Sequence, residues 1–277
     1  IERRKKSSVA DNLITYEDLP IRKEYIDEIK NQGITIHNRL RWFNAVTAYL
    51  NSSQIAVIKK LSFVDRIERV RLLRKSGRDI NVNESLLKSP GKNLPQDLQY
   101  DYGNSFTQLA LSDIPVVHSR GITGEGIIIG VLDTGFDWQT HESLMNSNII
   151  AEWDFIFQDS ITADQPYDVK GQHNHGTLCF SVVGGFKDGF LIGASFNSAF
   201  LLAKTEDLRM ESHLEEDNYA AALEWMETYG VDITTSSLGY SIFDDTTYSY
   251  TYSDMDGKTT IVTRAAELAF QRGVLTI

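Results

Sequence analysis

The sequence predicts a doubly wound α/β domain with a mainly parallel sheet, preceded by a smaller α+β domain. Residues 126–132 form a nearly unbroken apolar run, which is typical of a strand buried on both faces of a parallel sheet. Toward the C-terminus, short strand patterns then alternate with helical ones. A chain of 277 residues that is 42% apolar can also fill two hydrophobic cores.

The N-terminal stretch alternates helix and strand signals over about 75 residues, which is the pattern of an α+β unit with one open sheet. A helix is expected over residues 20–32, because Pro20 suits a first turn and Tyr25, Ile26 and Ile29 form an apolar stripe that Gly33 ends. Asn51 or Ser52 is expected to cap a second short helix. Strands are predicted at residues 34–36, 43–50 and 64–73.

A linker separates the two parts. Residues 75–95 carry Ser-Gly, Asn, Pro-Gly and Pro signals with little periodicity. We therefore predict an N-terminal domain at residues 1–74, a linker at 75–97 and the α/β domain at 98–277.

The remaining strands and helices of the α/β domain are predicted from the sequence after the first strand. Glycines at 230 and 273 are expected to end two of the helices. After the first strand, further strands are predicted at residues 200–203, 231–235 and 274–277, and helices at 175–183, 215–229 and 259–272. In sheets of this kind, functional groups collect at the carboxyl ends of the strands.

An acid and an imidazole occupy positions suited to proton transfer. Asp133 ends the first strand, and His175 opens a helix 42 residues later. A strand-end carboxylate that accepts a hydrogen bond from one imidazole nitrogen fixes the tautomer and leaves the other nitrogen free to take a proton. The two side chains are therefore predicted to lie within hydrogen-bonding distance.

Several segments of the α/β domain resemble subtilases, the family of subtilisin-like serine proteases. The resemblance covers residues 98–277 and implies that Asp133 orients His175, the general base and then acid. It also implies that the main chain of Ser237, Leu238 and Gly239 pairs with a peptide substrate. The matching segments are GVLDTGFD (130–137, the aspartate motif), QHNHGT (172–177, the histidine motif), DITTSSLG (232–239, the substrate-edge strand) and residues 263–277, which resemble the approach to the oxyanion-hole asparagine.

The N-terminal domain resembles a subtilase inhibitor propeptide of ferredoxin-like fold. The segments RWFNAV (41–46) and FVDRIE (63–68) are similar to the second half of such propeptides, and residues 102–114 resemble the start of a mature bacterial domain. The resemblance implies that this domain packs on the catalytic domain, assists its folding and lays its tail through the cleft. It also implies a maturation cut in the linker and a secreted or periplasmic protein.

The net charge of −11 is unevenly distributed. Residues 1–92 hold 19 Lys and Arg against 11 Asp and Glu, whereas residues 93–277 hold 8 against 27. Two solvated surfaces, or two segments that attract each other across an interface, both fit this split. Because the acidic partner is on the same chain, a nucleic-acid partner is not predicted, and no apolar run approaches the roughly 18 residues of a membrane span.

The serine nucleophile of the family, in a Gly-Thr-Ser motif, is not among the 277 residues, and neither is the oxyanion asparagine. Both are expected to follow Ile277, so this polypeptide alone is expected to be inactive. Two functions remain open: a secreted serine endopeptidase in zymogen form, and a non-catalytic subtilase-like fragment or pseudoenzyme that binds peptides.

No cofactor or metal site is predicted. His173 and His175 lack the further ligands that a metal pair needs. Ser143 stands where many relatives use an acid for calcium, so no recognisable calcium site is present. Cys179, the one cysteine, is expected to pack beneath the histidine as a small apolar side chain.

Overall fold

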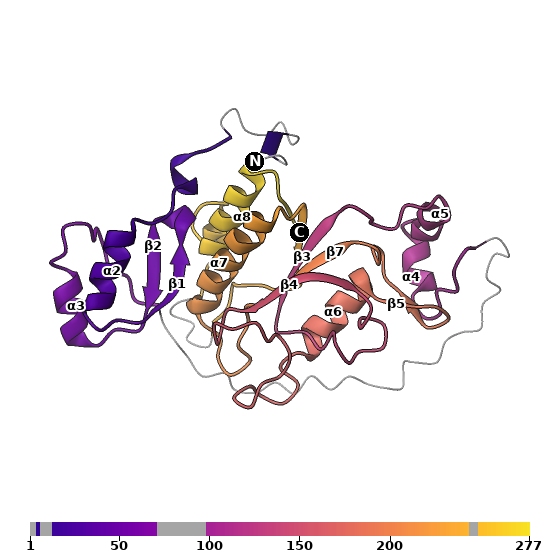
Figure 1. Cartoon of the computed structure of the whole chain (residues 1–277), viewed down its shortest axis with the longest axis horizontal. Helices are drawn as coiled ribbons and strands as arrows, with labels where there is room; N and C mark the ends of the chain where they lie inside the picture. Colours follow the sequence, from indigo (N-terminus) through magenta and orange to yellow (C-terminus); the bar gives the residue numbers. More distant parts are fainter. Residues whose placement is uncertain (1–3, 6–12, 71–97, 244–248) are drawn as a thin grey trace.

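The computed structural model describes residues 4–5, 13–70, 98–243 and 249–277 (Figure 1). A small N-terminal unit lies beside helices α7 (His213–Tyr229) and α8 (Ile261–Gln271) of a larger domain built around a parallel sheet. The predicted linker at residues 75–97 lies outside the described residues.

The N-terminal unit packs two helices against a two-stranded antiparallel sheet. Asn51 caps the second helix by accepting a hydrogen bond from the main chain of Gln54, and Gly33 ends the first with a φ of +70°. Ile29, Ile34 and Ile58 form its small core. In chain order the elements are η1 (Tyr16–Asp18), α2 (Lys23–Asn31), β1 (Ile36–Leu40), η2 (Arg41–Phe43), β2 (Ala45–Ala48) and α3 (Ser52–Ile58).

The predicted strand at residues 64–73 is wrong for the part that the structure describes. Residues 64–70 form no helix and no ladder, although Val64 and Ile67 pack against the small core. A segment becomes a strand only when a neighbour supplies ladder hydrogen bonds, and in the described residues the sheet of this unit contains β1 and β2 alone. The apolar residues Val64 and Ile67 therefore indicate packing against the core and not pairing in a sheet. Residues 71–73 lie outside the described ranges.

The larger domain confirms the predicted doubly wound α/β fold. Its five strands are all parallel to their neighbours, in the order β4-β7-β3-β8-β9. Helix α6 (Asn174–Gly184) lies on one face of the sheet, and α7 and α8 lie on the other. The strands are β4 (Asn148–Asp154), β7 (Ala199–Lys204), β3 (Ile128–Asp133), β8 (Ile233–Ser236) and β9 (Leu275–Thr276).

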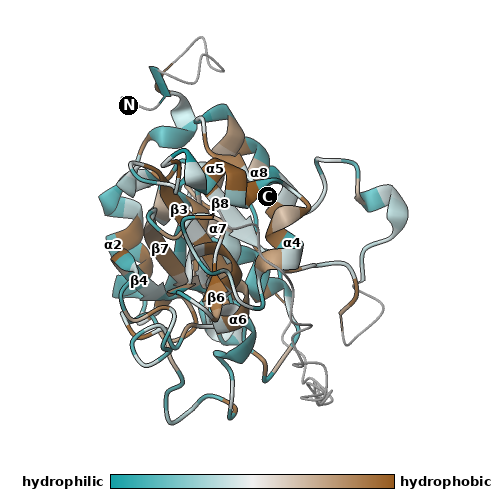
Figure 2. Ribbon diagram, turned by 90° about the vertical axis from the view of Figure 1, so that its right-hand side faces the viewer, coloured by the Kyte–Doolittle hydropathy of each residue, from teal (hydrophilic) through white to brown (hydrophobic). Residues whose placement is uncertain are grey.

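Alternate residues of the central strands feed the two cores, and Figure 2 shows hydrophobic residues concentrated along these strands. Leu132 and Leu201 pack toward α7 and α8, whereas Val131 and Leu202 pack toward α6. Gly130 lets α7 approach closely, because a Cβ there would lie 2.3 Å from the sulfur of Met226. The two cores fix β3 between helices and thereby fix the position of its last residue.

The predicted helix ends at positions 230 and 273 are confirmed, since both glycines have positive φ. Strand β4 was not predicted; it lies at the edge of the sheet, and Asp154 is its one fully buried residue. None of the helices in the described part of the chain is both long and apolar enough to span a membrane. The remaining unpredicted elements are α4 (Phe106–Ala110), α5 (Ile114–Ser119), β5 (Phe186–Lys187), β6 (Leu191–Ile192) and η5 (Tyr252–Asp254).

Candidate active site

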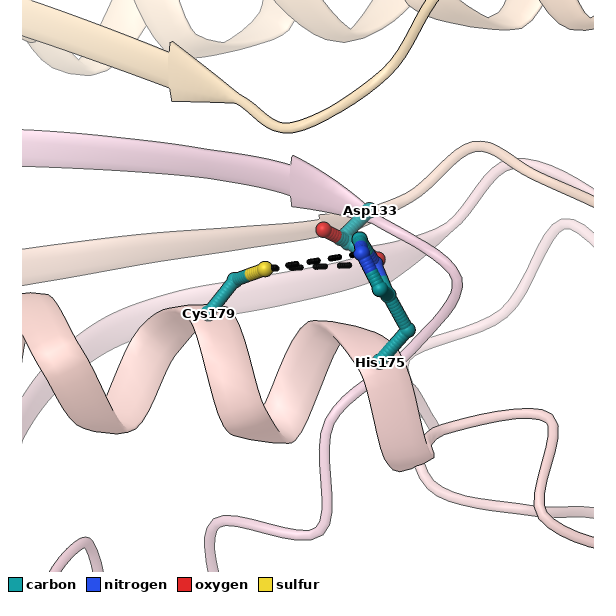
Figure 3. A group of neighbouring side chains, drawn as sticks. All are labelled: Asp133, His175 and Cys179. Carbon is teal, nitrogen blue, oxygen red and sulfur yellow. Dashed lines mark hydrogen bonds and ion pairs between the residues drawn. The ribbon is translucent and has the colours of Figure 1, made fainter. Parts of the chain in front are cut away.

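Asp133 and His175 meet at the carboxyl end of β3, as predicted (Figure 3). Asp133 is completely buried, and its Oδ1 accepts hydrogen bonds from His175 Nδ1 at 2.7 Å and from the main chain of Thr134 at 2.7 Å. Among the described residues, its Oδ2 has no hydrogen-bond partner. Because Nδ1 donates to the carboxylate, the neutral ring keeps Nε2 unprotonated and able to accept a proton.

Two glycines bring the start of α6 against the end of β3. Gly135 has a φ of +131°, and a Cβ there would lie 2.5 Å from the carbonyl oxygen of Thr162. At Gly176 a Cβ would lie 2.2 Å from the carbonyl oxygen of Gly135. The Gly176 N–H donates to the hydroxyl of Thr134, 3.2 Å away. These close approaches explain why the Asp-Thr-Gly and His-Gly-Thr sequences create the geometry.

His173 has a different partner. The ring Nδ1 of His173 accepts a hydrogen bond from the main-chain N–H of Asp164 at 3.0 Å. The main-chain N–H of His173 donates to Asp164 Oδ1 at 2.9 Å. Asp164 also accepts from the main chain of Gly171 at 2.8 Å. His173 therefore closes the loop that precedes α6 and takes no part in the Asp133–His175 pair.

Cys179 lies one turn after His175 and is half-buried. Its sulfur lies 3.9 Å from Nδ1 and 3.8 Å from Nε2 of the His175 ring, a weak contact with both nitrogens (Figure 3). Burial raises the pKa of the thiol, and the charge of Asp133 adds to this, against the lowering effect of a hydrogen bond with Ser237. The thiol therefore stays protonated at neutral pH.

Within the described ranges, the ligand atoms of Asp133, His175 and Cys179 lie close enough together to hold a metal ion.

The predicted substrate-binding residues lie next to this pair. Ser237, Leu238 and Gly239 follow β8, which pairs directly with β3. Ser237 and Gly239 are exposed, whereas Leu238 packs against the main core. In the part of the chain that the structure describes, no main-chain hydrogen bond engages these three residues. Their peptide groups are thus open to a ligand, while their role in binding stays a prediction.

Sequence reasoning missed two buried polar residues at the same edge of the sheet. Gln172 is fully buried and donates to the carbonyl oxygens of Thr134 at 2.9 Å and Glu206 at 2.6 Å. Lys204, which follows the apolar run of β7, is fully buried between Asp154 at 2.9 Å and Asp168 at 2.7 Å. A charged residue at the end of an apolar run was the available signal for Lys204. Gln172 opens the QHNHGT segment that matched the histidine motif, but nothing in that segment indicated its buried contacts.

Helix α7 presents carboxylates to the N-terminal unit. Glu224 is buried and accepts from the main chain of Arg41 at 2.8 Å and of Trp42 at 2.9 Å, at the start of η2. Asp217 accepts from the hydroxyl of Thr47 at 2.9 Å. Burial raises the pKa of Glu224 to about 7 and that of Asp217 to about 6, against the lowering effect of these hydrogen bonds.

A second group of buried charges joins the N-terminal segment to the ends of α7 and α8. Arg4 pairs with Glu227 at 2.8 Å and with Asp18 at 2.7 Å. Arg272 donates to Asp18 at 2.8 Å, and its guanidinium lies 4.9 Å from the ring centre of Trp42. Opposite charges do meet across the interface, but hydroxyl and main-chain donors hold Asp217 and Glu224.

A parallel sheet with helices on both faces, carrying an acid–imidazole pair at its carboxyl edge, defines a subtilisin-like α/β domain. Two family models match the chain: the peptidase S8 propeptide domain of Bacteroidota at residues 1–85 and the subtilase family at residues 124–275. The second match covers more than half of the chain. The chain therefore belongs to the subtilase family and carries a propeptide domain of that family at its N-terminus.

A solved structure with a TM-score above 0.5 supports this fold. Fervidolysin from Fervidobacterium pennivorans, a keratinolytic enzyme related to subtilisin, is similar with a TM-score of 0.55 and 18% identity over 93% of this chain and 38% of its own. The prenylagaramide maturation protease PagA matches with a TM-score of 0.42 and 19% identity over 59% of this chain and 49% of its own. The Aeromonas sobria serine protease, solved with its chaperone, matches with a TM-score of 0.38 and 17% identity over 47% of this chain and 21% of its own. The chain thus spans less than half the length of each of these proteins.

Proposed function

We propose that this chain is the zymogen portion of a secreted or periplasmic serine endopeptidase. The observation that carries the proposal is the 2.7 Å hydrogen bond between His175 Nδ1 and the buried carboxylate of Asp133. In a subtilase, this pair activates a serine hydroxyl, and peptide-bond hydrolysis is the reaction that such an arrangement serves.

In the proposed mechanism, Asp133 holds the imidazole in one tautomer and stabilises its cationic form. His175 Nε2 takes the proton of the attacking serine and then gives it to the leaving amine. The serine belongs to a Gly-Thr-Ser segment, which is not among these 277 residues.

The substrate binds as an added strand along Ser237, Leu238 and Gly239. Main-chain hydrogen bonds supply affinity in this mode, so a broad sequence preference is expected. The exposure of Ser237 and Gly239, and the open peptide groups of the segment, support this role.

The N-terminal domain acts as an inhibitor in this proposal. Its buried contacts with α7 and α8 would keep it bound after a cut between Lys75 and Tyr102. Tyr102 is 1% exposed and the main chain of Asn104 bonds to Phe190 at 2.9 Å, so the larger domain holds the chain from this point onward. That anchoring supports a cut before Tyr102.

Peptide cleavage by protein made from the whole reading frame tests the proposal. His175→Ala should lower turnover by several orders of magnitude, and Asp133→Asn nearly as much, because the wrong tautomer then dominates. His173→Ala is the matched control and should change turnover little. An essential His173 with a dispensable His175 would reject the assignment, and peptide binding without cleavage in any form would favour a non-catalytic binding protein.

Inhibition tests the role of the N-terminal domain. A separate piece comprising residues 1–74 should inhibit the mature enzyme, and more weakly at high salt, because salt screens the attraction between the basic N-terminal part and the acidic larger domain during association. No inhibition at micromolar concentration would argue against an inhibitor role.

A further inference from the structure

The segment that carries Ser237, Leu238 and Gly239 is held at both of its ends. On one side, the main chain of Ser236 donates to the carbonyl oxygen of Ile277 at 3.0 Å, beside the β8–β9 pairing. On the other side follows Tyr240, which is 9% exposed. The position of the open peptide groups therefore depends on what Tyr240 contacts.

Tyr240 is fixed by its ring and by its hydroxyl. The ring packs edge-on against Tyr219 of α7, with centroids 5.9 Å apart. The hydroxyl donates to the carboxyl group of Glu206, which is buried after the end of β7. Tyr240, which follows residues 237–239, is thereby joined to Glu206, which lies 34 residues earlier in the sequence.

Glu206 is joined in turn to the acid–imidazole pair. Its carbonyl oxygen accepts from Gln172 Nε2, which also donates to the carbonyl oxygen of Thr134, the residue after Asp133. Gln172 Oε1 accepts from the main chain of Leu208 at 3.0 Å, so every polar atom of its amide is used. A continuous series of hydrogen bonds thus runs from Tyr240 to the turn that holds Asp133.

We propose that Tyr240 and Glu206 are positioning residues, which set the main chain of residues 237–239 at a fixed place relative to Asp133 and His175. The ligand that benefits is an extended peptide main chain, so the functional part of the inference rests on the proposed function. The positioning itself is a property of the chain and can be measured without substrate.

The charge state of Glu206 gives this inference a separate readout. Burial raises the pKa of Glu206 to about 8, with the charges of Glu211 and Asp133 adding to the effect and the Tyr240 hydrogen bond opposing it. The neutral carboxyl is therefore favoured well above the usual pH range of a glutamate, and Tyr240 senses directly the charge that forms as pH rises. The titratable groups that face it are Tyr240 after β8, Glu215 and Tyr219 on α7, Glu211 before α7 and Asp133 on β3.

An NMR pH titration of the full chain tests the positioning. The amide resonances of Leu238 and Gly239 should shift with a midpoint near pH 8, following Glu206. Glu206→Gln keeps an oxygen for the Tyr240 hydroxyl and should abolish that shift, and Tyr240→Phe should abolish it as well. Tyr250→Phe is the matched control, because it removes a similar hydrogen bond, 2.8 Å to Glu216, and should leave the shift intact. Amides of residues 238–239 that titrate equally in wild type and Glu206→Gln would overturn the inference, even if Tyr240→Phe fails to fold.

Binding of labelled hexa-alanine to the same proteins tests the functional part. At pH 7, Tyr240→Phe should weaken binding about tenfold, the cost of roughly one hydrogen bond, whereas Glu206→Gln should stay within about twofold of wild type. Equal affinities for wild type and Tyr240→Phe would overturn the positioning role. A wild-type chain that shows the titration but binds no peptide, even after a cut before Tyr102 and removal of the N-terminal domain, would instead contradict the proposed peptide-binding function.

Discussion

Asp217 offers a sharp test of how the N-terminal domain docks on the larger one. Its side chain is 4% exposed on α7, and its partner across the interface is the hydroxyl of Thr47 at 2.9 Å. Burial raises its pKa from 3.8 to about 6, and the charges of Glu216 and Glu68 add to the effect, against the lowering effects of Thr47 and His213. A neutral residue of the same shape should therefore suit this place better than a carboxylate at neutral pH.

The sign and size of the effect follow from proton linkage. The folded protein holds the proton of Asp217 more tightly than the unfolded chain does, so its contribution to stability is present below about pH 4 and lost as pH rises through 6. A pKa raised by roughly 2 units corresponds to about 3 kcal/mol, as an upper bound. Asp217→Asn can still accept the Thr47 hydrogen bond and cannot ionise. It should therefore match wild type near pH 4 and be about 1–3 kcal/mol more stable near pH 7.5.

Urea unfolding of the full chain from pH 4 to pH 8 measures this difference. Thr47→Val removes the hydrogen bond that favours the carboxylate, so its stability should fall more steeply with pH than that of wild type. Asp27→Asn is the surface control: Asp27 is half-exposed and pairs with Lys23, and its removal should change the pH dependence little. A difference between Asp217→Asn and wild type that is constant across the pH range would refute the reasoning.

Two further predictions concern single side chains. Glu224→Ala should lower the free energy of unfolding at pH 5 by about 2 kcal/mol or more, because it leaves two buried N–H groups without an acceptor. Exposed Glu28→Ala should cost far less in the same urea titration. The thiol of Cys179 should react with iodoacetamide more slowly at pH 7 than an exposed thiol does, since burial raises its pKa. A rate equal to that of free cysteine would contradict the burial of the thiol and its raised pKa.

The sequence predicted those parts of the fold and site that local patterns determine. The apolar run of β3, the capping of α3 by Asn51 and the glycines that end α7 and α8 were recognisable because each depends on a few neighbouring residues. Asp133 and His175 were identified because a strand end and a helix start place their side chains at one edge of a parallel sheet.

Features that depend on tertiary neighbours were not predictable. The apolar residues near Val64 suggested a strand, yet no ladder partner is present for residues 64–70 in the described structure. Gln172 lies in the matched histidine motif, but its contacts and those of Glu206 could not be predicted, because their partners come from three separate segments. The charge split was compatible with two solvated surfaces or with attraction across an interface, and ion pairs such as Arg4 with Glu227 do cross it. The hydroxyl donor of Asp217 and the main-chain donors of Glu224 could not be read from charge.

A double-mutant cycle on Asp133 and His175 tests most directly the claim that these residues act as one catalytic unit. In protein made from the whole reading frame, peptide turnover would be compared for Asp133→Asn, His175→Ala and the double variant. Because Asp133 acts only through His175, the double variant should be no slower than His175→Ala alone. Losses that multiply, with the double variant slower by the product of the two single effects, would contradict the account.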